Sequence, residues 1–195
     1  MCRLSLLVAV SVLSAGVPLD GSFAGDFVTA AWLSVPSASV ASEADRAAQR
    51  AADGTSWFAA TVTNEAEVAS AKWTVAGLGV FEAYVNGKRV GEDFLKPGFT
   101  SADKTKYSFS YDVMALMKTR KGEANALSAA VSSGWWRDQI VGYAGRKSAF
   151  RGELELTFAD GTHRTYGTCV DGWKCGIATA PPSRDSASRR NGGLC

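Results

Sequence analysis

The feature that most constrains this chain is a period of two in its hydrophobic pattern. Apolar and polar residues alternate from Tyr107 to Val113, and again from Phe150 to Phe158. Because successive side chains of a β-strand point to opposite faces, this period predicts strands that bury one face and turn the other outward. In the second segment Glu153 and Glu155 fall on the outward face, so we expect both carboxylates to be solvated.

Tight turns separate further short segments of β-forming residues. Asn86-Gly87 and Asp160-Gly161 each lie between two such segments, and Asn-Gly predicts a type I′ hairpin because that turn needs positive φ at both central residues. One helical turn is expected from Val113 to Leu116. With no long helix, these elements predict an all-β fold, an antiparallel β-sandwich of the jelly-roll or galactose-binding-like type. The other predicted strands are residues 57–62, 71–75, 80–85, 88–90, 125–132 and 162–168.

We expect four parts along the chain. Residues 1–24 resemble a secretory signal peptide, because an apolar stretch follows a basic residue and Ser22-Phe23-Ala24 offers small residues for cleavage; an unprocessed leader is the alternative. Residues 25–56 would hold an opening strand and an Ala-rich linker, and residues 57–180 the sandwich. Residues 181–195 are polar and basic and are predicted to be disordered. We therefore expect the protein to be secreted or periplasmic, with no membrane attachment after the signal is removed.

Charge and residue types argue against several functions. The formal net charge is +2, from 21 basic and 19 acidic residues, which gives no electrostatic case for binding nucleic acid. The single histidine, His163, does not support a metal site, and no Ser/His/Asp or Cys/His arrangement is evident. Glycosidases use two carboxylates, but the spacing of Glu153 and Glu155 is that of an ordinary strand face. We therefore expect no catalytic residues.

The cysteines leave two hypotheses open. Cys2 would be removed with the signal, which leaves Cys169, Cys175 and Cys195. Cys169 and Cys175 would form a disulfide if they faced each other across a turn; under the alternative, all three remain free thiols. Their odd number leaves at least one thiol without an intramolecular partner.

The most unusual segment is the aromatic loop, residues 134–138, which contains Trp135-Trp136-Arg137-Asp138. At least one indole of such a loop is expected to be exposed, where its ring would stack on the C–H groups of a sugar while Arg137 and Asp138 bind hydroxyl groups. Under the alternative, one indole closes the end of the sandwich and Arg137 pairs with Asp138. Asp138 and Asp103 also suit calcium, which prefers oxygen ligands, but their spacing assigns no calcium site.

Several motifs follow one another in an order that resembles the N-terminal domain of bacterial α-L-rhamnosidases. The resemblance covers residues 70–180 well and residues 31–69 loosely, and the ordered set is more specific than the Asn-Gly hairpin alone. The matching segments are Gly77–Gly91, Leu95–Thr100, Tyr107–Val113, Gly134-Trp135-Trp136-Arg137, Phe150–Thr162 and Trp173-Lys174.

This resemblance implies a jelly-roll-like β-sandwich that precedes an (α/α)₆ catalytic barrel. The acid and base carboxylates of the family belong to that barrel, so none is carried over and the chain is not expected to be an enzyme on its own. Some related modules bind L-rhamnose with calcium. No calcium motif matches here residue by residue, so no cofactor is assigned.

The chain departs from the family pattern in three places. The Ala-rich stretch near Ala41 replaces the usual opening strand, and Asp138 stands where the family commonly has Gly. The pattern is lost after Ala180, where the family continues with an acidic, Tyr-rich segment. We therefore expect the chain to be a piece of a longer enzyme that ends early because of truncation, a frameshift or a gene-model error. A missing closing strand would leave one sheet edge unpaired.

The leading hypothesis is a non-catalytic, carbohydrate-binding-like accessory domain derived from a rhamnoside-hydrolysing glycosidase. Its expected ligand is L-rhamnose or a rhamnoside, held by stacking on Trp135 or Trp136 and by a hydrogen bond from Arg137, with Asp138 beside them. The alternative is a structural module or remnant that packs between domains and binds no ligand.

Overall fold

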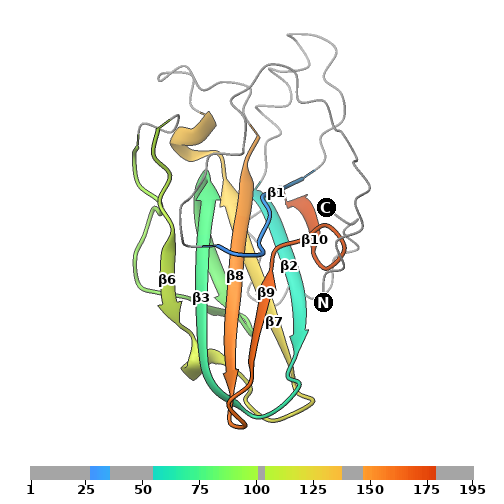
Figure 1. The fold of residues 1–195 in the computed structure, drawn as a ribbon. Coiled ribbons are helices and arrows are strands. Elements are labelled where there is room, and N and C mark those ends of the chain that lie inside the picture. Colours follow the sequence, from blue (N-terminus) through green and yellow to red (C-terminus); the bar gives the residue numbers. More distant parts are fainter. Residues whose placement is uncertain (1–26, 36–54, 101–103, 138–146, 179–195) are drawn as a thin grey trace.

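The computed structural model describes residues 27–35, 55–100, 104–137 and 147–178, which form two antiparallel sheets packed face to face (Figure 1). The first has the order β1 (Leu33–Ser34), β8 (Ala149–Phe158), β3 (Val68–Leu78), β6 (Phe109–Asp112), and β9 (His163–Gly167) also pairs with β8. The second has the order β10 (Lys174–Ala178), β2 (Thr55–Thr63), β7 (Ala124–Ser132), β4 (Val80–Val85), β5 (Lys88–Arg89). The all-β sandwich prediction is confirmed.

Some predictions fall outside the described residues. These are the signal peptide, the Ala-rich linker, the basic tail, Asp103 and Asp138. Within the described ranges, no helix is long and apolar enough to cross a membrane.

Several strands differ from the sequence prediction, and β3 extends three residues beyond the predicted 71–75 at each end. β6 begins at Phe109 rather than Tyr107, because its pairing with β3 ends at Phe109 and the Tyr107 side chain is exposed. β10 was not predicted, since Gly176 interrupts its pattern. That glycine lets β10 pair with β2: a Cβ at position 176 would lie 2.8 Å from Nε1 of Trp57.

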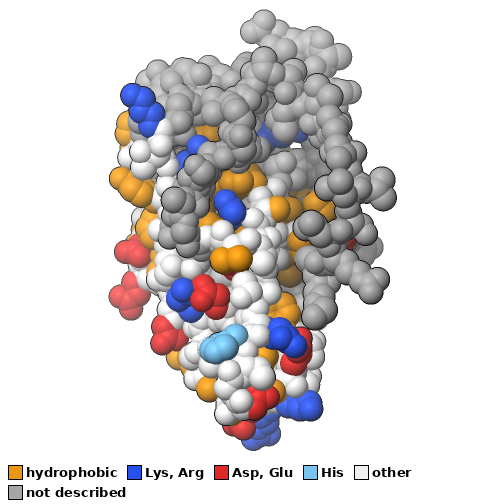
Figure 2. Space-filling view, viewed as in Figure 1, with side chains coloured by type: hydrophobic (Ala, Val, Ile, Leu, Met, Phe, Trp, Pro, Cys, Tyr) orange, Lys and Arg blue, Asp and Glu red, His pale blue; other side chains and the backbone are white. Residues whose placement is uncertain are grey.

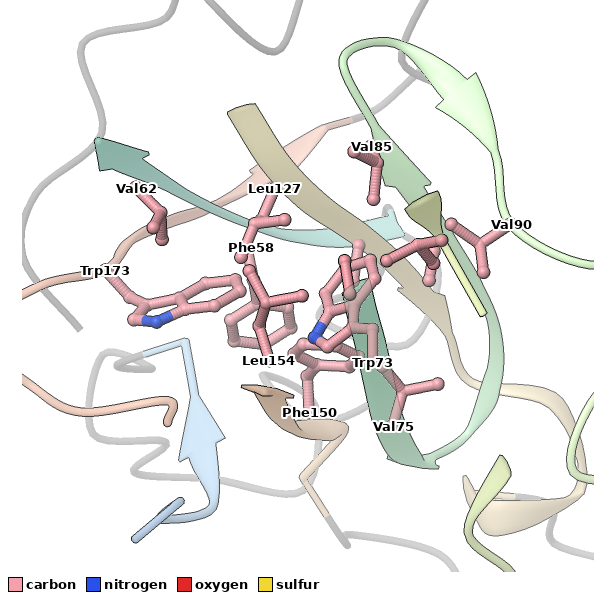
Figure 3. Close-up of a cluster of buried hydrophobic side chains, with 14 of the residues drawn as sticks. Phe58, Val62, Trp73, Val75, Val85, Val90, Leu127, Phe150, Leu154 and Trp173 are labelled. Atoms are coloured by element: carbon pink, nitrogen blue, oxygen red, sulfur yellow. The ribbon is translucent and has the colours of Figure 1, made fainter. Parts of the chain in front are cut away.

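The core is centred on Phe150 of β8, between the two sheets (Figure 3). Its ring contacts Phe58 of β2 at 5.8 Å between centroids, Trp73 of β3 at 6.2 Å and Trp173 at 5.8 Å. Phe81 of β4 lies 6.5 Å away. One side chain thus joins strands of both sheets and the segment leading into β10.

An asparagine network closes the end of the sandwich at the 3-10 turn η1 (Met114–Leu116). Asn86 and Gly87 have φ of 51° and 77°, the positive values of a type I′ turn. The Asn86 amide donates to the Leu116 carbonyl at 2.9 Å and to Oδ1 of Asn125 at 2.8 Å. Asn125 is fully buried and donates to Oδ1 of Asn64 at 3.1 Å. The hairpin turn is therefore fixed by the Asn125 side chain and by a backbone carbonyl of η1.

A strap, residues 27–31, crosses the outer face of the first sheet and corrects one prediction. Both Glu153 and Glu155 lie on that face, but Glu153 is only 1% exposed because the strap covers it. Its carboxylate accepts N–H groups from Val28 at 3.0 Å, Thr29 at 2.6 Å and Ala30 at 3.0 Å, and the Thr29 hydroxyl at 2.9 Å. A single carboxylate thus satisfies three successive backbone donors, whereas Glu155 stays partly exposed as expected.

Further contacts hold the strap on both sides of Glu153. Nε of Arg151 donates to the Ala30 carbonyl at 3.1 Å, and its guanidinium lies 4.5 Å from the centre of the Phe27 ring. Ala31 N–H donates to the Thr168 carbonyl at 2.8 Å. The strap is therefore bound to β8 and to the end of β9.

We expect Glu153→Gln to lower the free energy of unfolding by about 1–3 kcal/mol, because the new NH₂ group would face backbone N–H donors. Glu155→Gln is the matched control: it breaks only an exposed pair with Lys72, 2.9 Å long, worth at most about 1 kcal/mol. Urea unfolding of the two variants measures the difference. Equal losses would contradict the role given to Glu153.

Acid stability should depend on the same carboxylate. Burial alone would raise the pKa of Glu153, but the N–H groups of residues 28–30 and the Thr29 hydroxyl hold it below its ordinary value of 4.5. An acid with a lowered folded-state pKa stabilises the fold above its unfolded-state pKa, and that contribution disappears as the pH falls through the folded-state value. The melting temperature of the wild type should therefore drop more steeply below pH 4.5 than that of Glu153→Gln. Parallel acid profiles would refute this.

Candidate functional site

An open pocket lies at the end of the sandwich that carries the second 3-10 turn, η2 (Gly134–Arg137). Its floor is the glycine-rich connection between β3 and β4. One wall is the segment from Pro97 to Thr100, another is the tryptophan pair, and Lys106 completes the lining. The lining residues are Gly77, Leu78, Gly79, Val80, Pro97, Gly98, Phe99, Thr100, Lys106, Trp135 and Trp136.

The two tryptophans of the aromatic loop have different environments. Trp135 is 37% exposed, whereas Trp136 is half-buried and its Nε1 donates to the Lys147 carbonyl at 2.7 Å. Trp136 thereby ties η2 to the start of the segment that leads into β8, and Trp135 is the more exposed of the two indoles. Arg137 is the last residue of η2, and Asp138 lies outside the described residues.

Glycines allow the aromatic loop to approach β4 closely. Gly134 has a φ of 47°, and a Cβ there would lie 2.4 Å from Cγ2 of Val80. Gly79 has a φ of 127°, and a Cβ there would lie 2.2 Å from the Ser132 carbonyl oxygen. Side chains at these positions would be strained and would push the floor and the tryptophan wall apart.

The wall from Pro97 to Thr100 is attached to the sandwich through Lys96. The Lys96 carbonyl accepts the Phe81 N–H at 2.9 Å, and the Gly98 N–H donates to the Leu95 carbonyl at 2.9 Å. The Lys96 side chain points inward and is 2% exposed. The wall then presents Phe99 with its ring largely exposed.

The lining is suited to binding rather than to acid–base chemistry. It combines an exposed indole, an exposed phenyl ring and a lysine, and it includes no carboxylate among the described residues. Glu153 lies under the strap on the outer face of the first sheet and is not among the lining residues. Across the described ranges, no three His, Cys, Asp or Glu residues gather to hold a metal ion.

Of the residues that line this pocket, the sequence analysis named only the two tryptophans as candidates. Trp135 and Trp136 were predicted, but Phe99, Lys106 and the floor from Gly77 to Val80 were not. A usable signal was present, since three of the family-like motifs contain these walls and the floor.

The family model for the alpha-L-rhamnosidase N-terminal domain matches residues 66–180. The chain belongs to this family. The match contains the whole pocket, but it excludes the strap. Among curated relatives, an alpha-L-rhamnosidase of Alteromonas sp. (strain LOR) is 36% identical over 115 residues, which are 56% of this chain and 12% of that protein. One from Streptomyces avermitilis is 38% identical over 100 residues, 49% of this chain and 9% of that protein.

Solved structures of family members have the same fold. Alpha-L-rhamnosidase from Streptomyces avermitilis, crystallised in complex with L-rhamnose, matches with a TM-score of 0.58 and 32% identity, over 65% of this chain and 12% of that one. The enzyme from Aspergillus terreus matches with a TM-score of 0.56 and 25% identity, over 64% and 15%. The present chain thus spans a small part of the length of the enzymes it resembles.

Gly134→Ala is expected to destabilise the protein by about 2 kcal/mol or more, because a positive φ is combined with a clash against Val80. Gly122→Ala is the matched control. Its φ of 82° is also positive, but nothing lies within 4 Å of the added Cβ, so only backbone strain of about 1 kcal/mol applies. Thermal unfolding of both variants tests this. A loss at Gly134 no larger than that at Gly122 would show that the close approach is not required.

Proposed function

We propose that this domain binds carbohydrate in the open pocket and that its ligand is L-rhamnose or a rhamnoside. The observation that carries the proposal is the exposed indole of Trp135 facing a pocket whose other wall presents Phe99. A saturated sugar ring has C–H faces that stack on such aromatic surfaces. Membership of a family found in alpha-L-rhamnosidases supports rhamnose as the sugar.

The residues of the pocket would divide the recognition between them. Trp135 would supply the stacking surface, because Trp136 is held in place by its bond to Lys147. Arg137 and Asp138, which follow Trp136 in the sequence, would complete the site, with Arg137 donating to sugar hydroxyl groups. The Thr100 hydroxyl donates to the Thr105 carbonyl at 2.9 Å, so its oxygen retains the capacity to accept a bond from a ligand.

We further propose that the domain is not catalytic by itself. The match to the family lies within the accessory N-terminal domain. Glycoside hydrolysis requires two carboxyl groups flanking the bond that is cut, and the described lining supplies none. A rhamnoside assay of the purified chain is expected to show no turnover.

A second candidate function, packing against a neighbouring domain, is favoured by one specific observation. The segment from Phe94 to Phe99, which runs into the pocket wall, exposes three large apolar side chains. They are Phe94 at 75%, Leu95 at 61% and Phe99 at 62%. Figure 2 shows hydrophobic side chains at the surface along the β6 edge of the molecule. Contiguous exposed apolar area is typical of an interaction surface.

Export is a separate proposal that rests on the sequence alone. The apolar stretch near the N-terminus and the small residues before position 25 are typical of a cleaved signal. Sequencing the N-terminus of the protein recovered from outside the cytoplasm would test it, and an intact Met1 would refute it.

Calorimetric titration of the folded protein with L-rhamnose is expected to show saturable binding that D-glucose does not reproduce. Trp135→Ala should weaken binding at least about fivefold, because the stacking surface is lost. Phe94→Ala is the control, since Phe94 is also aromatic and is more exposed than Trp135 but lies outside the pocket lining. The titration is repeated with calcium to test the ion. Absence of binding in a folded sample would reject the sugar site and favour the packing function.

A further inference from the structure

Lys96 is an unusual residue to find inside this sandwich. It is a lysine with 2% of its surface exposed, and it directly precedes the pocket wall that begins at Pro97. Taking an ammonium group out of water is unfavourable unless hydrogen bonds and nearby charges compensate. A buried lysine at this position therefore calls for a specific role.

The contacts of the Lys96 ammonium join the wall to two other segments. Nζ donates to the Val90 carbonyl at 3.2 Å and to the Tyr111 hydroxyl at 3.1 Å. It also lies 4.8 Å from the centre of the Tyr111 ring and 5.5 Å from that of Phe81. These partners belong to the end of the β4–β5 hairpin, to β6 and to β4. Each sheet thus contributes a contact to one ammonium group.

Neighbouring groups surround the ammonium with both signs of charge. Burial and, after it, the Arg89 guanidinium lower the pKa of Lys96, while the Asp93 and Glu82 carboxylates act in the opposite direction. Burial also raises the pKa of Tyr111 to about 12, with the Asp93 carboxylate adding to the effect. The Tyr111 hydroxyl therefore stays protonated and can accept from Lys96 while facing Asp93, 3.4 Å away.

We infer that Lys96 is a positioning residue for the sugar pocket: its buried ammonium holds the wall from Pro97 to Thr100 at a fixed distance from the Trp135 wall. One consequence of this inference, that sugar affinity depends on Lys96, rests on the proposed function. Its structural part, the fixing of the wall, stands on the contacts alone. Both walls are therefore held in place, one by the Lys96 ammonium and the other by the bond from Trp136 to the Lys147 carbonyl.

This role differs from a general contribution to stability. Replacing Lys96 by an apolar side chain of similar length removes the cost of burying an ammonium group, and this gain offsets the loss of its two hydrogen bonds. Lys96→Met keeps the aliphatic stem within the core but removes both hydrogen bonds. We expect a melting temperature close to that of the wild type together with about a tenfold loss of affinity for L-rhamnose, the factor that corresponds to one lost charge-assisted bond.

The experiment compares wild type, Lys96→Met and Lys88→Met by calorimetry with L-rhamnose and by amide hydrogen exchange. Lys88 is an exposed lysine of the β4–β5 hairpin and lies outside the pocket lining. Its variant should therefore match the wild type in affinity and in Gly98 exchange. In Lys96→Met the Gly98 amide should exchange about tenfold faster, while amides in the centre of β3 keep their protection.

The two proposals fail in different ways. If the wild type binds no sugar, the proposed function fails, and exchange at Gly98 still decides whether Lys96 fixes the wall. If Lys96→Met leaves both Gly98 exchange and affinity unchanged, the inference about Lys96 is overturned. Should Lys96→Met not fold, Tyr111→Phe removes a single acceptor oxygen; faster Gly98 exchange in that variant supports the inference, and unchanged exchange overturns it.

Discussion

The structure depends on the contact of the Phe150 ring with aromatic side chains from both sheets. Trp73 reaches it from the neighbouring strand β3, Phe58 and Phe81 come from the opposite sheet, and Trp173 closes the group. A two-sheet domain is stable only if the inner faces interdigitate, and here one ring is shared by four others. Because β4 carries Phe81 and continues from the pocket floor, this packing also decides where the candidate site lies.

The alternation of side chains made most of the fold predictable from the sequence. It located β3, β4, β7 and β8 to within a few residues, and the Asn86-Gly87 pair located the hairpin. Period and turn chemistry are local properties, so they can be found without knowing the partners of a strand. β10 was missed because its pairing depends on Trp57 lying over Gly176, and such a contact has no local signature.

The candidate site was predictable only in part, for the same reason. Two adjacent tryptophans indicated a loop worth attention, but which indole is exposed depends on the carbonyl of Lys147. Alternation placed Glu153 correctly on an outward face, yet it could not reveal that the strap covers that face. Lys96 was interpreted only as part of a family-like motif, because burial of a lysine follows from partners as distant as Tyr111.

The strap also sets an order of events during synthesis. Val28 and the carboxylate that holds it are 125 residues apart, and Thr168, which binds Ala31, is made later still. A chain that emerges from the ribosome N-terminus first must therefore leave its opening segment undocked until β8 and β9 exist. Contacts of such long sequence separation form slowly. The strap thus stays undocked through most of translation, a period in which factors that bind extended chains have access to it.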